Sequence, residues 1–160
     1  MASELKNLSE YSQNNITDIS KKVFGIVVAE WNEKVTGALA KGAKELLELQ
    51  GIKQDDLIEI KVPGSFELPS GAQAILEKHN PDAVIILGCV IQGETRHFDF
   101  ICQGVTKGVM DLSIQYKTPV IFGLLTTDTM EQALARSGGN HGNKGVEAAV
   151  TALKMASVWK

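Results

Sequence analysis

The sequence has few cysteines and no grouping of residues that would hold a metal ion. Its two cysteines are Cys89 and Cys102, which is too few for a disulfide framework. No cluster of histidine, aspartate or glutamate has the spacing of metal ligands. Two isolated thiols are typical of reduced cysteines in the cytoplasm, and the surroundings of Cys102 predict that it lies in the core. We therefore expect neither a bound metal nor a disulfide.

Excess charge of one sign and long apolar runs are also missing. The chain has 16 lysines and arginines against 19 aspartates and glutamates, a formal net charge of −3, so the basic excess typical of nucleic-acid binding is absent. No apolar run approaches the roughly 20 residues of a membrane span. Residues 1–20 are polar and lack the apolar centre of a signal peptide. These absences predict a cytoplasmic protein that binds neither nucleic acid nor membrane.

Several common enzyme motifs are absent as well. No Gly-x-Gly-x-x-Gly follows the first predicted strand, so a dinucleotide fingerprint is excluded. In the glycine-rich segment 137–145, Lys144 is followed by Gly145 rather than by serine or threonine, which excludes a Walker loop. No serine stands in the turn that carries the nucleophile of α/β hydrolases. Hydrolase and metalloenzyme activities are therefore disfavoured.

The composition predicts one ordinary globular domain. The 160 residues are 44% hydrophobic and 22% charged, and a chain of this length buries roughly two thirds of its unfolded surface. Residues 1–20 are rich in serine and asparagine with weak periodicity, so we expect an extended or mobile N-terminal arm. Residues 21–160 are expected to form a single α/β domain without repeats or linkers.

Within that domain, predicted strands alternate with predicted helices. Short apolar, β-branched runs predict strands at 23–29, 57–62, 83–87 and 119–125. Helical periodicity predicts helices at 32–49, 68–79, 98–116, 129–136 and 143–158. This alternation is typical of parallel strands with right-handed crossovers. We expect a flavodoxin-like three-layer α/β/α sandwich with a central four-stranded parallel sheet, in which strand 57–62 lies near an edge.

Segment 88–97, after strand 83–87, is expected to be a loop at the carboxyl end of a buried strand. Open α/β sheets bind their ligands at this end. The segment carries glycines, the hydroxyl of Thr95, and His97, which can move protons near neutral pH. A histidine in a loop is about equally often a surface hydrogen-bonding residue, so position alone leaves its role open.

Other polar or aromatic side chains follow the remaining strands, and each has two interpretations. Trp31 either stacks on a flat ligand ring or closes the edge of the domain. Glu67 either accepts hydrogen bonds from sugar-like hydroxyls or complements a helix dipole. Arg136 lies beside glycines and near Lys144, a combination suited to an anion.

Five separated segments of this chain resemble the 6,7-dimethyl-8-ribityllumazine synthase family. The resemblance extends from about Val23 to the C-terminus, and one such segment alone would be weak. The segments, in the same order as in the family, are Trp31-Asn32, 62–69 (VPGSFELP), 88–99 (GCVIQGETRHFD), 119–123 (PVIFG), and Arg136 with 142–145 (GNKG).

The resemblance implies a transferase of riboflavin biosynthesis. The family condenses 5-amino-6-(D-ribitylamino)uracil with 3,4-dihydroxy-2-butanone 4-phosphate, giving 6,7-dimethyl-8-ribityllumazine, phosphate and water. The amine can form an imine with the ketone directly, so no cofactor is expected. The residues that would bind the pyrimidine and ribityl groups are Trp31, Ser65, Phe66, Glu67, Cys89, Val90, Ile91 and Phe122.

The resemblance also implies which residues handle the phosphate and the protons. His97 matches the proton-transfer residue, and Glu94, Thr95, Arg136 and Lys144 would surround the phosphate. Phe122 and Arg136 match residues that a neighbouring subunit contributes. Gln92 and Asn140 replace positively charged residues that are common in the family, which predicts weaker binding of the phosphate substrate.

The family also predicts a homo-oligomer with shared active sites, at least a pentamer. The compact turn 135–145 has no proline, which permits a sixty-subunit icosahedral capsid, and association with riboflavin synthase is a further expectation. The arm 1–20 would add a strand to a neighbour's sheet. Two rival functions remain: a flavin- or nucleotide-binding module without turnover, and a structural cage protein.

Overall fold

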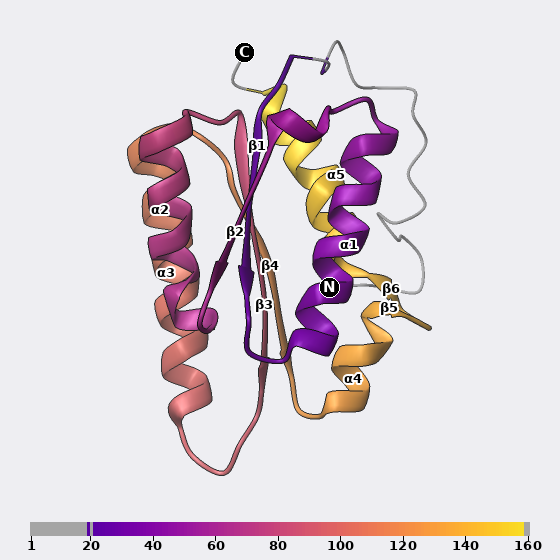
Figure 1. Cartoon of the computed structure of the whole chain (residues 1–160). Coiled ribbons are helices and arrows are strands. Elements are labelled where there is room, and N and C mark those ends of the chain that lie inside the picture. Colours follow the sequence, from indigo (N-terminus) through magenta and orange to yellow (C-terminus); the bar gives the residue numbers. More distant parts are fainter. Residues whose placement is uncertain (1–18, 20, 159–160) are drawn as a thin grey trace.

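The computed structural model describes Ile19 and residues 21–158, which form a four-stranded parallel sheet with helices on both faces (Figure 1). The strands are β1 (Phe24–Ala29), β2 (Leu57–Val62), β3 (Ala83–Ile91) and β4 (Val120–Thr127). Their order across the sheet is β2-β1-β3-β4. The predicted position of strand 57–62 at an edge is therefore confirmed.

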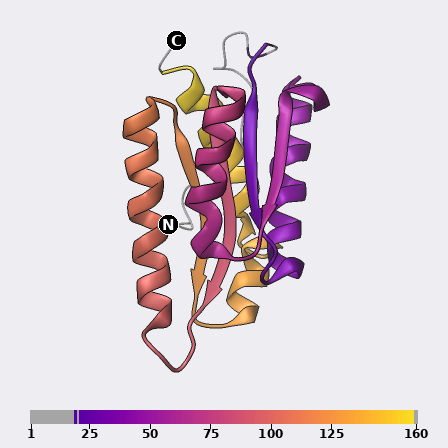
Figure 2. The same ribbon diagram turned by 60° about the vertical axis from the view of Figure 1, so that its left-hand side comes forward.

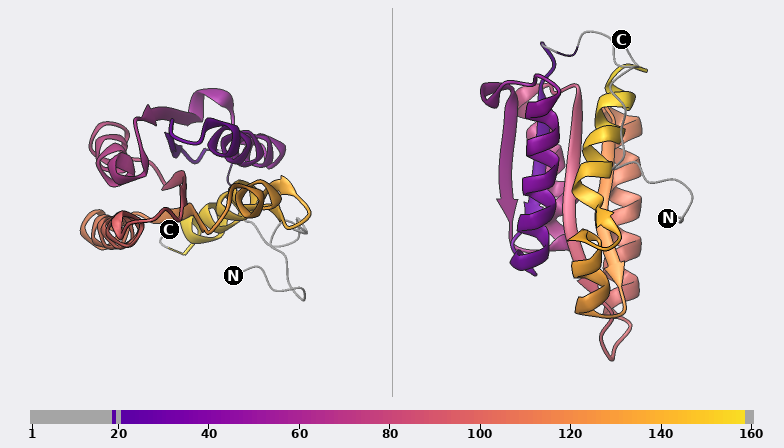
Figure 3. Two further views of the ribbon diagram at one scale, coloured as in Figure 1. Left: turned by 90° about the horizontal axis from the view of Figure 1, so that it is seen from below. Right: turned by 90° about the vertical axis from the view of Figure 1, so that its right-hand side faces the viewer.

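In the described part of the chain, five helices cover the two faces of the sheet. The helices α2 (Leu68–His79) and α3 (His97–Tyr116) stand side by side on one face (Figure 2). The helices α1 (Glu33–Leu49), α4 (Met130–Ala135) and α5 (Lys144–Ala156) cover the other (Figure 3). Single 3₁₀ turns at Gln54–Asp56 and Ser65–Glu67 precede β2 and α2. The predicted three-layer α/β/α sandwich is confirmed.

The central strands are apolar because both of their faces are covered. Phe24, Ile26 and Val28 of β1 pack in the core shared with α1 and α5, whereas Val27 and Ala29 pack in the core beneath α2 and α3. All six residues of β1 are buried. Such continuous apolar runs are typical of parallel strands in α/β proteins, and each fully buried aliphatic side chain contributes roughly 1.5–3 kcal/mol.

Strand β3 is longer than its sequence predicts. It continues through Gly88 to Ile91, in register with β4 as far as the pair Ile91↔Thr127, so the loop expected at 88–97 is confined to 92–96. Gly88 looked like the start of that loop. In the sheet its role is steric, because a Cβ there would lie 2.7–2.8 Å from side chains of Leu124, Leu68 and Ser65.

The glycine-rich segment before α5 is also more ordered than predicted. It forms a small antiparallel hairpin of β5 (Ser137–Gly139) and β6 (Gly142–Asn143). Gly138 and Gly142 have φ values of +119° and +77°, which only glycine adopts readily.

Two further expectations concern Cys102 and the N-terminal arm. Cys102 is half-buried on α3 rather than in the core, so that prediction was wrong. The arm at 1–20 lies outside the described residues apart from the buried Ile19. Within the part of the chain that the structure describes, no helix is long and apolar enough to cross a membrane.

Candidate active site

A cavity of about 740 Å³ opens at the carboxyl end of the sheet, beside β1 and β3. The chain leaves β1 toward α1 on one face and leaves β3 toward α3 on the other (Figure 1). Adjacent strands whose connections diverge in this way form the crevice in which α/β proteins bind ligands. The lining residues are Trp31, Asn32, Gly64, Ser65, Phe66, Glu67, Cys89, Val90, Ile91, His97, Phe100 and Ile101.

Trp31 is a largely exposed ring at the wall of this cavity. Its side chain is 73% exposed, while its backbone N–H donates to the carbonyl of Pro63 at 3.2 Å. The preceding N–H of Glu30 donates to the carbonyl of Val62 at 2.8 Å. The backbone is therefore held against the β2 loop while the ring remains free. An exposed indole on a fixed backbone is suited to stacking on a flat ligand.

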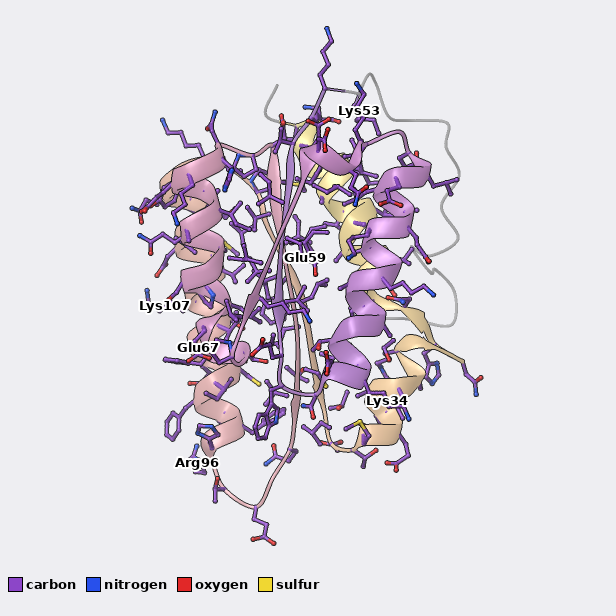
Figure 4. All side chains as sticks on the ribbon, viewed as in Figure 1. Lys34, Lys53, Glu59, Glu67, Arg96 and Lys107 are labelled. Atoms are coloured by element: carbon purple, nitrogen blue, oxygen red, sulfur yellow. The ribbon has the colours of Figure 1, made fainter. Side chains whose placement is uncertain are left out.

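The segment before α2 supplies a hydroxyl, an aromatic ring and a carboxylate. Ser65 is buried, and its Oγ has no hydrogen-bond partner among the described residues. A buried hydroxyl without a partner is uncommon, so this oxygen is available to a polar ligand group or a water at this wall. Phe66 is 58% exposed, and Glu67 is half-buried. Figure 4 shows Glu67 at the same end of the sheet as Arg96, which is the residue that precedes α3.

The end of β3 offers main-chain groups to the cavity. Cys89 is buried, and burial raises the pKa of its thiol from 9.0 to about 11, so the thiol is neutral and unsuited to act as a nucleophile near pH 7. The carbonyl of Cys89 accepts a hydrogen bond of 2.9 Å from Nδ2 of Asn32. Val90 and Ile91, which are partly buried, follow it along the wall.

His97 is the first residue of α3, and its side chain is exposed at the rim of the cavity. Its backbone N–H donates to Oγ1 of Thr95 at 3.4 Å. Thr95 and Glu94 are exposed on the short loop before the helix and do not line the cavity. An exposed imidazole at this rim can reach a ligand and exchange protons with water.

The other three residues predicted for the site lie away from the cavity. Phe122 is 40% exposed in a second groove beside edge strand β4. Arg136 ends α4, where Nη1 donates to the carbonyl of Gln132 at 3.0 Å. Lys144 begins α5 and forms a 2.5 Å ion pair with the buried Glu147. One chain therefore does not bring Phe122, Arg136 or Lys144 to the cavity that His97 borders.

The structure adds four residues to the predicted cavity lining. They are Asn32, Gly64, Phe100 and Ile101. Phe100 and Ile101 follow His97 by three and four positions, so helical spacing alone could have placed them on the same face. Asn32 and Gly64 belong to two of the five segments that resemble the family, but no binding role was predicted for either residue. Among the described residues, no group of three histidine, cysteine or acidic side chains is placed to hold a metal ion.

Comparison with known proteins gives a consistent result. Residues 21–160 match the family model described as 6,7-dimethyl-8-ribityllumazine synthase. Proteins of that name from Cytophaga hutchinsonii and Parabacteroides distasonis are 58% and 53% identical, over 97% and 98% of both chains respectively. The Flavobacterium johnsoniae protein of the same name is 54% identical over 99% of this chain and 83% of its own length. This chain therefore belongs to the 6,7-dimethyl-8-ribityllumazine synthase family.

Proposed function

We propose that this protein condenses 5-amino-6-(D-ribitylamino)uracil with 3,4-dihydroxy-2-butanone 4-phosphate, a step of riboflavin biosynthesis. The products are 6,7-dimethyl-8-ribityllumazine, phosphate and water. One observation carries the proposal: apart from Phe122, every residue expected to bind the pyrimidine and ribityl groups lines a single cavity bordered by His97. Family membership supports the same reaction.

In this proposal the pyrimidine lies between the loop after β1, which carries Trp31, and the end of β3. Trp31 stacks on the ring, and the main chain of Cys89, Val90 and Ile91 pairs with its edge. Glu67 accepts hydrogen bonds from the ribityl hydroxyls. The unpartnered Oγ of Ser65 supports a polar ligand group at that wall.

The chemistry requires positioning, proton transfer and release of phosphate. The substrate amine attacks the ketone to form an imine with loss of one water, and phosphate then leaves by elimination. The ribitylamino nitrogen closes the second ring on the remaining carbonyl with loss of a second water. Holding two reactants in line can contribute about 7–11 kcal/mol to catalysis. A single acid–base group such as His97 adds roughly 10²–10⁴-fold.

We further propose that the phosphate site is completed by a second subunit. Phe122 and Arg136 lie away from the cavity of their own chain, and Phe122 is exposed at the edge of the sheet. A neighbour related by rotation could bring both of them to the rim near Thr95, Glu94 and His97. Lys144 would join them only if its ion pair with Glu147 opened.

Shared sites need at least a second copy of the chain, and from the resemblance to the family we propose a closed ring of at least five subunits. The hairpin before α5 is short and contains no proline, which supports packing of pentamers into a sixty-subunit capsid able to house riboflavin synthase. Sedimentation of the full chain tests both the ring and the capsid. A mass of five or ten chains would contradict the capsid, and a fully active monomer would contradict shared sites.

Mixing the two substrates with the protein tests the reaction itself. We expect the absorbing, green-fluorescent lumazine to form with release of one phosphate per product. A flavin- or nucleotide-binding module would bind a flat ring without forming lumazine. A structural cage protein would neither bind the ring nor form lumazine. Absence of lumazine at saturating substrates would therefore overturn the proposed function.

A further inference from the structure

The geometry points to Asn32 as a positioning residue that holds the pyrimidine-facing end of β3 in place. This inference rests on the proposed function of the cavity. Asn32 lines the cavity, and its Nδ2 donates a hydrogen bond of 2.9 Å to the carbonyl oxygen of Cys89. The two residues are 57 positions apart, so the bond joins the loop after β1 to the end of β3.

A side-chain donor is needed here because β1 has already left β3. Their pairing ends with Val28 opposite Leu87. Beyond that pair, the N–H groups of Glu30 and Trp31 donate to carbonyls of β2 and its loop. Cys89 is 1% exposed, and a buried carbonyl without a donor is costly. The amide of Asn32 supplies the donor that the β1 backbone no longer provides.

The backbone of Asn32 is shaped for this contact. Its φ and ψ are 61° and 43°, a left-handed conformation that asparagine and glycine tolerate better than most residues. Asn32 is also the N-cap of α1, where an asparagine side chain ordinarily accepts from the first turn. Here it makes no such capping bond. The amide is instead directed across the crevice to Cys89.

The position of this bond predicts which substrate it affects. Trp31 directly precedes Asn32, and Val90 directly follows Cys89. The bond therefore sets the separation between the stacking ring and the main chain that faces it. On its far side, β3 is held by β4 through the pairs Val90↔Thr126 and Ile91↔Thr127. Loss of the bond should therefore loosen β3 only on the side that faces Trp31 and receives the pyrimidine.

Two substitutions and one matched control test this role. Asn32→Asp keeps the size and the tolerance for left-handed backbone but removes the N–H donor. Asn32→Gly removes the side chain and keeps the backbone freedom. Asn80→Gly is the control, because Asn80 has φ 46° and ψ 54°, is exposed, and ends α2 far from the cavity.

We expect the KM for the aminopyrimidine to rise about tenfold in both Asn32 variants, the effect of losing one buried hydrogen bond. The KM for the butanone phosphate and the kcat should stay within about twofold, and Asn80→Gly should match the unaltered protein. A general folding defect would instead affect both substrates and the melting temperature. An unchanged KM in Asn32→Asp would overturn the inference.

A measurement without substrate checks the bond directly. Cys89-Val90 is the only Cys-Val pair in the chain, so labelling cysteine carbonyls with ¹³C and valine amides with ¹⁵N isolates the Cys89 carbonyl resonance. It should move in both Asn32 variants and not in Asn80→Gly. If the unaltered protein forms no lumazine, the proposed function fails while this resonance still reports the bond. If lumazine forms and the resonance stays fixed in the Asn32 variants, only the role of Asn32 fails.

Discussion

A Cβ atom on Gly145 would lie 1.9 Å from the carbonyl oxygen of Leu39, so α5 and α1 meet backbone to backbone at this point. The neighbouring Asn143 caps α5 by accepting from the N–H of Gly145 at 2.8 Å, and its Nδ2 donates to the carbonyl of Ala38 at 3.0 Å. The N–H of Lys144 donates to the carbonyl of Arg136 at 2.9 Å. This contact therefore sets where Arg136 stands relative to α1.

Gly145→Ala should destabilise the protein by about 3 kcal/mol or more, because a methyl group would force two helix backbones apart. Gly37→Ala is the matched control within α1, since no atom of the described residues lies within 4 Å of where its Cβ would be. It should stabilise the protein by up to about 1 kcal/mol through helix propensity. Urea unfolding measures both changes, and equal stability of the two variants would contradict the close contact.

Arg136→Ala should nearly abolish turnover and leave binding of the aminopyrimidine largely intact. A guanidinium that binds phosphate in a partly dry site makes charge-assisted bonds that stabilise the transition state by about 4 kcal/mol, which corresponds to a loss of roughly 10³-fold in rate. Steady-state kinetics together with direct binding of the aminopyrimidine separates the two effects. An unimpaired rate at saturating butanone phosphate would exclude the proposed role.

Co-assembly of Arg136→Ala and His97→Ala subunits tests whether the site is shared. If His97 and Arg136 come from different chains, random mixing in equal amounts gives about a quarter of the sites both an intact His97 and an intact Arg136. The mixture should then be more active than either variant. If one chain supplied both residues, the mixture would show only the mean of the two separate activities.

His97→Ala should lower kcat roughly ten- to several-hundred-fold, a smaller loss than that of Arg136→Ala. Part of the condensation can proceed without an enzymatic acid, which limits the loss. Both Michaelis constants should remain near those of the unaltered protein. A change confined to one Michaelis constant would make His97 a binding residue rather than a proton-transfer group.

The buried thiol of Cys89 should make the protein less stable at alkaline pH. Burial raises its pKa from 9.0 to about 11, so the unfolded thiol ionises at a lower pH than the folded one. The free energy of unfolding is therefore unaffected by this group below about pH 9 and falls as the pH rises toward about 11, by up to about 3 kcal/mol. Unfolding at about pH 8 and pH 10.5 should show a larger loss for the unaltered protein than for Cys89→Ala. Equal losses would contradict this prediction.

The elements that the sequence predicts best are those with a strong local pattern. Strand 57–62 and helix 68–79 match β2 and α2 residue for residue, because alternation and helical spacing act over neighbouring residues. The end of β3 was missed because Gly88 is a turn residue by type, yet here it is required by side chains from α2 and β4. The β5–β6 hairpin was missed because its glycines carry no apolar pattern.

The sequence by itself determined the order of strands and helices, the two-sided burial of the sheet, and the family to which the chain is similar. Each depends on residue types at short spacing, and backbone geometry converts that spacing into one face or another. Only the tertiary structure decided that Asn32 reaches Cys89, that β3 runs on to Ile91, and that Lys144 pairs with Glu147 away from the cavity. Those outcomes depend on where loops direct the chain and on which side-chain volumes meet, and neither is encoded in local periodicity.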